Sequence, residues 1–210
     1  MNNILSEKAK LIESHVKRWK KIYHTPICLA QGECSGVIGK SHTVSEAMSL
    51  KYIAENDHVL VRQANLFGQA VQQVLGLKKH SVHDALTFPG FCNRHDMDLF
   101  KSLDRSPFMA TPEQLFMQAY RCDCREYYFK ACQVQVSLDA TQIAELQGLP
   151  GDKKYKLSPL FELNKEAMYR SLGDSIASKE KFEKLLANLD YRRLQSYVVH
   201  ARCSPGGGPQ

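Results

Sequence analysis

Four side chains that bind transition metals stand in two pairs in the first half of the chain. Cys28 and Cys34 are separated by five residues that include Gly32, and Cys92 and His95 are separated by two residues. The first spacing places two thiols on one loop, and the second places a thiol and an imidazole one helical turn apart, where both can face one point. Three thiolates and one imidazole suit a closed tetrahedral zinc site. The spacing therefore predicts a structural Zn2+ ion held by Cys28, Cys34, Cys92 and His95.

An imidazole and a carboxylate accompany these four ligands. His42 lies eight residues after Cys34, and Asp96 directly follows His95. A zinc ion that joins the two pairs would hold both groups near one helix start. There His42 could act as a general base, and Asp96 could bind a second, catalytic cation. In a competing arrangement, His42 is itself a zinc ligand and either Cys28 or Cys34 is left out of the site.

These residues resemble those of the HNH endonucleases, the ββα-metal nucleases, in the members of that family that carry zinc. In those members a Cys pair precedes a dipeptide that ends in His, and a later Cys-x-x-Cys-His closes the zinc site and supplies a metal-binding His. Ser41-His42 looks like the first His element. The run Cys92-Asn93-Arg94-His95-Asp96 looks like the second, with His95 in place of the second Cys and Asp96 in place of the metal-binding His. The resemblance covers roughly residues 26–104.

The resemblance implies both a fold and an activity. The fold would be a small zinc-bound ββα-metal unit, similar to a treble clef. His42 would activate a water molecule, and Asp96 would hold Mg2+ or Mn2+ at the scissile phosphate of DNA or RNA. Nucleases of this family serve in restriction, mobile elements, toxins and phage defence, so the resemblance also suggests a role in antiviral defence.

A second interpretation is a catalytically inactive zinc module. Ser41 precedes His42 where the family has an acidic residue, and the family's middle Asn has only Asn65, His83 and Asp84 as substitutes. Under this interpretation the protein binds nucleic acid or a protein partner through a helical arm. Substitution of His42 would then change affinity at most.

The composition sets the broad class of protein. The 210 residues are 43% hydrophobic, which is enough for one or two small domains with a core. The formal net charge of +6 permits nucleic-acid binding without demanding it. Seven cysteines, without an apolar leader or a membrane-spanning run, predict a cytoplasmic protein with free or metal-bound thiols and no membrane partner. No Walker-type loop, dinucleotide fingerprint or Gly-x-Ser-x-Gly elbow occurs, so the sequence gives no support for a P-loop nucleotide site, a dinucleotide site or serine-dependent hydrolysis.

Short elements must position the proposed site. Trp19 is expected to anchor the first helix in the core, and Thr43-x-x-Glu46 is expected to form a capping box. The elements expected in this half are a helix over 6–23, a turn and strand over 35–42, a helix from 43 to about 54, a strand over 58–62, a helix or ordered loop over 65–77, a polar loop over 78–84, a strand over 85–88 and a helix over 91–103.

The second half of the chain should be a helical hairpin. Thr111-Pro112-Glu113-Gln114 predicts a strong helix start, and no Pro or Gly intervenes up to residue 147. A second long helix should run from Ser158-Pro159 to about residue 191, perturbed near Gly173. Such a hairpin could pack on the first helix, form a homodimer or bind a protein partner. Cys122, Cys124 and Cys132 are expected to be small buried side chains, because thiols two residues apart on a helix point in nearly opposite directions.

The expected fold class is therefore α+β, with a small zinc-bound unit joined to a mainly helical region. The expected divisions are residues 1–105 for the first helix and the zinc unit, 106–194 for the hairpin region, and 195–210 for a strand and a flexible Gly/Pro-rich tail.

Overall fold

The structure is a computed structural model that describes residues 14, 17–34, 36–64, 75–146 and 159–196. Helices dominate it, and its strands form two separate two-stranded antiparallel sheets within the described residues. This mixture of helices and small sheets agrees with the expected α+β class. No described helix has both the length and the apolar character that a membrane crossing requires.

The first sheet and the helix that follows it make the unit around the predicted zinc ligands. Strand β1 (Ser41–His42) pairs with β4 (Thr87–Phe88), with Ser41 opposite Phe88 and His42 opposite Thr87. Helix α4 (Asn93–Leu99) follows β4 after a short turn. The order strand, strand, helix is the order expected from the sequence, although both strands are shorter than the ranges 35–42 and 85–88.

Between β1 and β4 the chain makes a helical turn and a long ribbon. The turn consists of the π-helix η1 (Glu46–Leu50) and the short α2 (Lys51–Ile53). The ribbon pairs β2 (His58–Ala64) with β3 (Leu75–Ser81) over seven residues of each strand. A small apolar cluster at its base contains Leu50, Val59, Val82 and Ala85.

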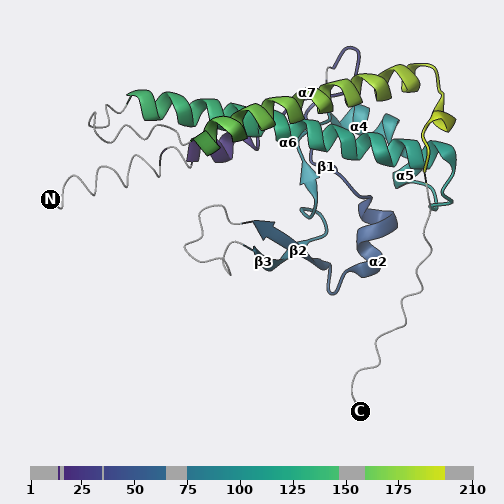
Figure 1. Cartoon of the computed structure of the whole chain (residues 1–210). Coiled ribbons are helices and arrows are strands. Elements are labelled where there is room, and N and C mark those ends of the chain that lie inside the picture. Colours follow the sequence, from purple (N-terminus) through teal and green to yellow (C-terminus); the bar gives the residue numbers. More distant parts are fainter. Residues whose placement is uncertain (1–13, 15–16, 35, 65–74, 147–158, 197–210) are drawn as a thin grey trace.

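Helices α6 (Pro112–Leu146) and α7 (Pro159–Ala187) lie side by side and run in opposite directions, as Figure 1 shows. Phe182 of α7 packs on Phe116 and Tyr120 of α6, with ring centroids 5.3 and 6.0 Å apart. Short helix α5 (Lys101–Asp104) leads into α6, and the 3-10 turn η3 (Tyr191–Arg193) follows α7. The expected helical hairpin is therefore confirmed. The helix α7 passes through Gly173 without a break.

The hairpin also packs on the end of the first helix, of which residues 17–22 are described as helical. The hydroxyl of Tyr128 donates to the backbone carbonyl of Thr25 at 2.9 Å, and the rings of Tyr23 and Phe129 lie 6.1 Å apart. Trp19 is half-buried. The expected strand over 197–202 and residues 65–74 lie outside the described residues.

Four local predictions were wrong. Residues 78–81 belong to strand β3 rather than to a polar loop, because polar side chains suit the open face of a two-stranded ribbon. The helix after His42 begins at Glu46, and Thr43 is not its cap: its hydroxyl is buried with no hydrogen-bond partner among the described residues. The helix over 91–103 is divided at Phe100 into α4 and α5. Cys122 is exposed, whereas Cys124 and Cys132 are buried as expected.

Candidate metal centre and the adjoining cavity

The four predicted zinc ligands come together at the start of α4. One ligand atom each from Cys28, Cys34, Cys92 and His95 lies within 4.8 Å of all the others. His95 Nδ1 is 3.2 Å from Cys28 Sγ and 3.4 Å from Cys92 Sγ. With Zn–S and Zn–N bonds of about 2.3 and 2.0 Å, neighbouring ligands of a tetrahedral zinc ion lie about 3.5 Å apart. The separations and the donor set therefore fit a metal ion such as zinc.

Backbone hydrogen bonds clamp the loop that carries the two upstream thiols onto the start of α4. Ile27 N donates to Pro89 O, and Leu29 N donates to Gly90 O, at 3.1 and 2.9 Å. Past the thiols, the chain pairs again, with Ile38 bridged to Cys92. Gly36 passes so close that an added Cβ would lie 3.0 Å from the Cys92 side chain. The loop with Cys28 and Cys34 and the start of α4 are far apart in sequence, but these backbone contacts hold them together.

Cys92 is the N-cap of α4. Its Sγ accepts a hydrogen bond from the backbone N–H of His95 at 3.4 Å. That N–H group holds the pKa of the Cys92 thiol below its ordinary value, even though burial opposes the charged form. A helix start of this kind favours the thiolate, which is the form that binds zinc.

The competing arrangement, with His42 as a zinc ligand, does not match the geometry. His42 is absent from the group of four, and its Nε2 lies 2.9 Å from the carbonyl oxygen of Val82. Because a carbonyl oxygen only accepts, Nε2 must carry the proton, and in the neutral ring Nδ1 is then the basic nitrogen. His42 is therefore held by the segment that follows β3, beside the metal centre rather than in it.

His42 and Asp96 line one cavity of about 220 Å³. The other lining residues are Ser45, Glu46, Ala47, Asp104 and Arg121. His42 comes from β1, Glu46 from η1, and Asp96 from the first turn of α4. The two groups predicted to act together are thus placed on the same hollow, next to the metal centre.

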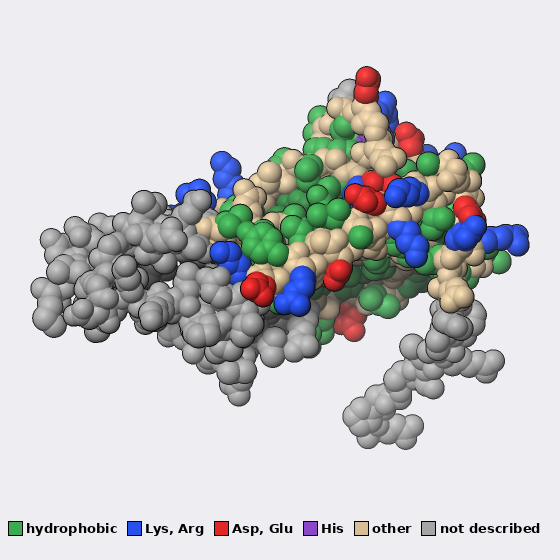
Figure 2. All heavy atoms as spheres, turned by 45° about the horizontal axis from the view of Figure 1, so that its top comes forward, with side chains coloured by type: hydrophobic (Ala, Val, Ile, Leu, Met, Phe, Trp, Pro, Cys, Tyr) green, Lys and Arg blue, Asp and Glu red, His purple; other side chains and the backbone are tan. Residues whose placement is uncertain are grey.

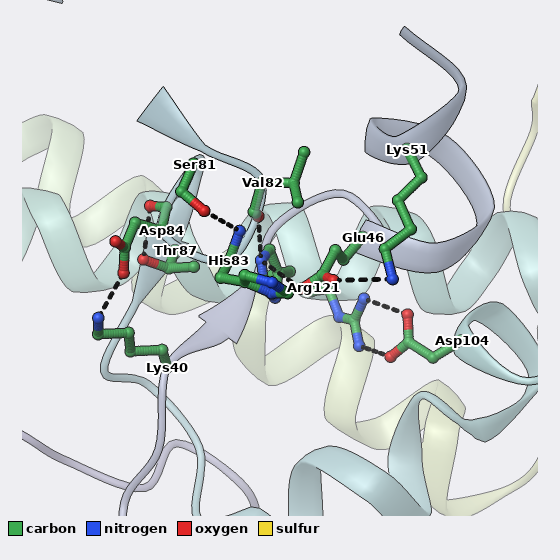
Figure 3. A network of polar contacts seen from close by, with 11 residues as sticks. Lys40, Glu46, Lys51, Ser81, Val82, His83, Asp84, Thr87, Asp104 and Arg121 are labelled. Atoms are coloured by element: carbon green, nitrogen blue, oxygen red, sulfur yellow. Dashed lines mark hydrogen bonds and ion pairs between the residues drawn. The ribbon is translucent and has the colours of Figure 1, made fainter. Parts of the chain in front are cut away.

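Glu46 is a member of this cavity that the sequence did not reveal. Its Oε2 lies 3.0 Å from His83 Nδ1 and 3.6 Å from His42 Nε2, and its Oε1 lies 3.2 Å from Lys51 Nζ. Figure 3 shows Glu46 between Lys51 and His83, with Val82 beside them. Burial opposes the charge on Glu46, but the hydrogen bonds from His83 and Lys51 outweigh it and lower the pKa of the Glu46 carboxyl. The glutamate three residues after Thr43 was the available signal, interpreted as a helix cap.

Asp96 shares the opposite wall with an arginine. Ser41 Oγ donates a hydrogen bond to Asp96 Oδ1, and a guanidinium nitrogen of Arg121 lies 4.0 Å from the same oxygen. Burial raises the pKa of the Asp96 carboxyl, although Ser41 and Arg121 both act to lower it. Among the described residues, Ser41 and Arg121 both contact Oδ1 of Asp96. Oδ2 is therefore the oxygen that can bind a further ligand such as a cation.

Arg121 is completely buried in α6, where the sequence gave no sign of a site residue. Its two terminal nitrogens pair with the two carboxylate oxygens of Asp104, as Figure 3 shows, and its guanidinium lies 4.0 Å from the centre of the Phe100 ring. This bidentate pairing fixes the guanidinium at the cavity, and Asp104 balances its charge.

The sequence offered Asn65, His83 and Asp84 as substitutes for the middle Asn of the HNH endonucleases, and the described ones lie in different places. His83 contacts Glu46 at the cavity, whereas Asp84 forms an exposed ion pair with Lys40 at 2.5 Å. Asn65 lies outside the described residues. Only His83 therefore reaches the group around His42.

Comparisons of this chain with protein-family models, with curated proteins and with solved structures find no match.

Proposed function

We propose that this protein is a metal-dependent endonuclease of HNH-like type, built on a structural zinc site. One observation carries the proposal: His42 on β1 and Asp96 on α4 line the same cavity, and these are the two elements that flank the metal centre. The zinc ligands fix the start of α4 against the loop that precedes β1, and so they fix the spacing of the two reactive groups.

His42 has the features of a general base. The Val82 carbonyl orients its ring and leaves Nδ1 as the basic nitrogen, and Glu46 lies near enough to stabilise the imidazolium that forms. Nδ1 would take a proton from a water molecule while the water oxygen attacks the phosphorus, and the bond from phosphorus to one ester oxygen would break. A divalent cation such as Mg2+ or Mn2+, held through Asp96 Oδ2, would supply positive charge to the phosphate when bound.

The test is cleavage of supercoiled plasmid DNA and of RNA by the full-length, zinc-loaded protein with Mg2+ or Mn2+. Cation dependence should be measured by leaving these ions out, because a chelator would also take the zinc. Replacing His42 with Ala should lower the rate about 10²- to 10⁴-fold, the usual range for loss of a general base.

His24 offers a matched control, because it is an exposed histidine at the end of the first helix. The variant His24→Ala should cut as the parent does. Equal cutting by His42→Ala and His24→Ala, with zinc content and helix content unchanged, would refute the assignment of the base.

A specific observation favours a second candidate, the catalytically inactive zinc module. Arg121 already places a cation beside Asp96 and Asp104, and a divalent ion at Asp96 would be repelled by it. Such a module would act by binding, with its helical hairpin toward a protein partner or a second copy. Figure 2 shows hydrophobic side chains gathered among charged ones on one face of the molecule, and Tyr169 and Ile176 of α7 are exposed. A folded, zinc-loaded protein that cuts neither DNA nor RNA would favour this candidate.

A further inference from the structure

The ribbon of β2 and β3 stands out from the rest of the fold. Its seven residue pairs run from His58 opposite Ser81 to Ala64 opposite Leu75. At about 3.3 Å per residue, such a ribbon is roughly 20 Å long. Figure 1 shows it apart from the helices α6 and α7, on the side of the molecule that carries β1 and α2. Its sheet contains no third strand among the described residues.

Only one face of this ribbon packs against other described residues. Residues directly opposite each other in the ladder share a face, and successive residues alternate. Val59 is 7% exposed and packs in the cluster at the base of the ribbon, with Val61 against it. On the other face Leu60 and Leu77 are 61% and 69% exposed, and Lys79, opposite Leu60, is also exposed. Nothing in the described part of the chain covers this second face, which we call the outer face.

The ribbon is also basic. The sequence from His58 to His83 contains no Asp or Glu, whereas it contains Arg62, Lys78 and Lys79. Both lysine side chains are exposed, Lys79 on the outer face and Lys78, opposite Val61, on the other face. An open ribbon with apolar and cationic side chains but no acid is complementary to a polyanion that also offers apolar surface.

Its base forms part of the candidate active site. Directly after Ser81, Val82 accepts the hydrogen bond from His42, and His83 bonds to Glu46. A ligand lying along the ribbon would therefore lead to the cavity.

We infer that the outer face of the β2–β3 ribbon binds double-stranded DNA in the major groove and delivers it to the His42 cavity. The major groove of B-form DNA, about 12 Å wide, admits a two-stranded ribbon, in which Lys side chains reach phosphates or guanines and Leu side chains meet thymine methyl groups. The major groove of duplex RNA is too deep and narrow for such an entry. The delivery step rests on the proposed nuclease function, but the binding step does not.

Binding can be measured by fluorescence anisotropy with the full-length, zinc-loaded protein and a labelled 20-bp duplex DNA, without Mg2+ or Mn2+. The variant Lys79→Ala, on the outer face, should bind duplex DNA severalfold more weakly, and its log–log salt slope should be smaller by about 0.9, the value for one lost phosphate contact. The variant Leu60→Ser/Leu77→Ser should weaken duplex binding without changing the salt slope. Duplex RNA of the same sequence should bind more weakly than the DNA.

The control is Lys181→Ala, which removes the same charge from an exposed position on α7. Equal affinities of the ribbon and control variants for duplex DNA, with zinc content and circular dichroism unchanged, would overturn the inference, and so would equal binding of duplex RNA. Failure of the nuclease proposal gives a different result: duplex binding that depends on the ribbon, without cleavage under any cation.

Discussion

Glu46 joins three basic side chains at the cavity. Its partly exposed carboxylate contacts His83 and Lys51, and it lies beside His42. Arg121 plays the matching role for Asp96 and Asp104 on the opposite wall. The cavity thus contains three carboxylates: Glu46 has its own basic partners, and Asp96 and Asp104 share Arg121, so part of the negative charge is balanced before any ligand enters. A phosphate or a cation would have to compete with these ion pairs. The strength of the pairs that Glu46 makes can be measured through its ionisation.

The pH dependence of folding stability should reveal the Glu46 contacts. The pKa of Glu46 is lower in the folded protein than its ordinary value, so its ionised form stabilises the fold at pH values above the ordinary carboxyl range. That contribution is lost as the pH falls through the lowered pKa. Glu46→Gln should therefore be less stable than the parent by roughly 1–2 kcal/mol at pH 7, and the two stabilities should converge as the pH falls below 4.5, the ordinary value, and through the lowered pKa. Urea unfolding at several pH values measures both.

The matched control for this prediction is Glu126→Gln, which removes the same charge from an exposed position on α6 where Lys130 is its partner. It should change the stability by less than about 0.5 kcal/mol at any pH. A Glu46→Gln variant whose stability stays parallel to that of the parent from pH 7 down to about pH 3 would show that the contacts with His83 and Lys51 contribute nothing.

The sequence predicted the metal ligands better than the cavity. Cys28, Cys34, Cys92 and His95 could be identified because ligand chemistry and spacing carry their own signal. The carbonyl of Val82 cannot be identified in this way, because every residue has a carbonyl. Arg121 lies in the middle of a long helix, where a basic residue normally faces solvent, and only the packing of α6 on α5 buries it against Asp104.

At the scale of elements, both long helices begin where the sequence predicted, because their start signals are local; α6 also ends where expected, whereas α7 ends at Ala187, short of the expected residue 191. Gln114 and Thr111 form the expected reciprocal cap of α6: Gln114 N donates to Thr111 Oγ1, and Thr111 N donates to Gln114 Oε1. Strand β3 was missed for the opposite reason. Lys78, Lys79 and His80 carry no apolar alternation, and only the pairing with β2 makes them a strand.

Gln114 does more than cap its helix, and this gives a prediction. It is buried, its Oε1 accepts from Met109 N, and its Nε2 donates to the carbonyls of Ser102 and Pro107. Gln114→Ala should therefore lower the free energy of unfolding by about 2–3 kcal/mol, because several buried backbone groups lose their partners. Gln133→Ala, at an exposed position on the same helix, should change it by less than about 0.5 kcal/mol. Equal effects in urea unfolding would mean that the connection between α5 and α6 does not depend on Gln114.

At the scale of the whole molecule, the metal centre and the helical hairpin share one core. Phe88, next to the metal centre, lies 5.9 Å from the ring of Tyr128 in α6, and Phe100 lies 6.4 Å from Tyr120. A single buried cluster contains residues from both parts: Leu29, Phe88, Phe91, Phe100, Leu103, Phe116, Met117, Tyr120, Cys124, Tyr128 and Cys132. The sequence suggested a division near residue 105, but no spacing in a sequence says whether two segments bury their apolar faces against each other.

Because the core is shared, we expect loss of zinc to destabilise the helical hairpin as well as the metal centre. Removal of the ion leaves three thiols and an imidazole without the bond that joins the loop at Cys28 to helix α4, and structural zinc sites contribute about 10 kcal/mol or more of apparent binding energy. Without that bond, Phe88 and Phe91 lose their fixed position against α6. Titration with a chelator should therefore reduce the helical circular dichroism and shift the fluorescence of Trp19, the only tryptophan, in one coincident transition.

Cys92→Ser should reproduce the chelated state, whereas Cys122→Ser, which changes an exposed thiol outside the group of four, should keep the zinc and the parent's melting temperature. The opposite result would be a helical signal that survives chelation and melts at an unchanged temperature. In that case α6 and α7 would be stable through their own contacts, such as Phe116 with Phe182, and the metal centre would be a separate folding unit. Coincident loss of the helical circular dichroism and of the Trp19 fluorescence signal would instead mean that the zinc ligands stabilise the shared core. Through that core they would also fix the position of the His42 cavity.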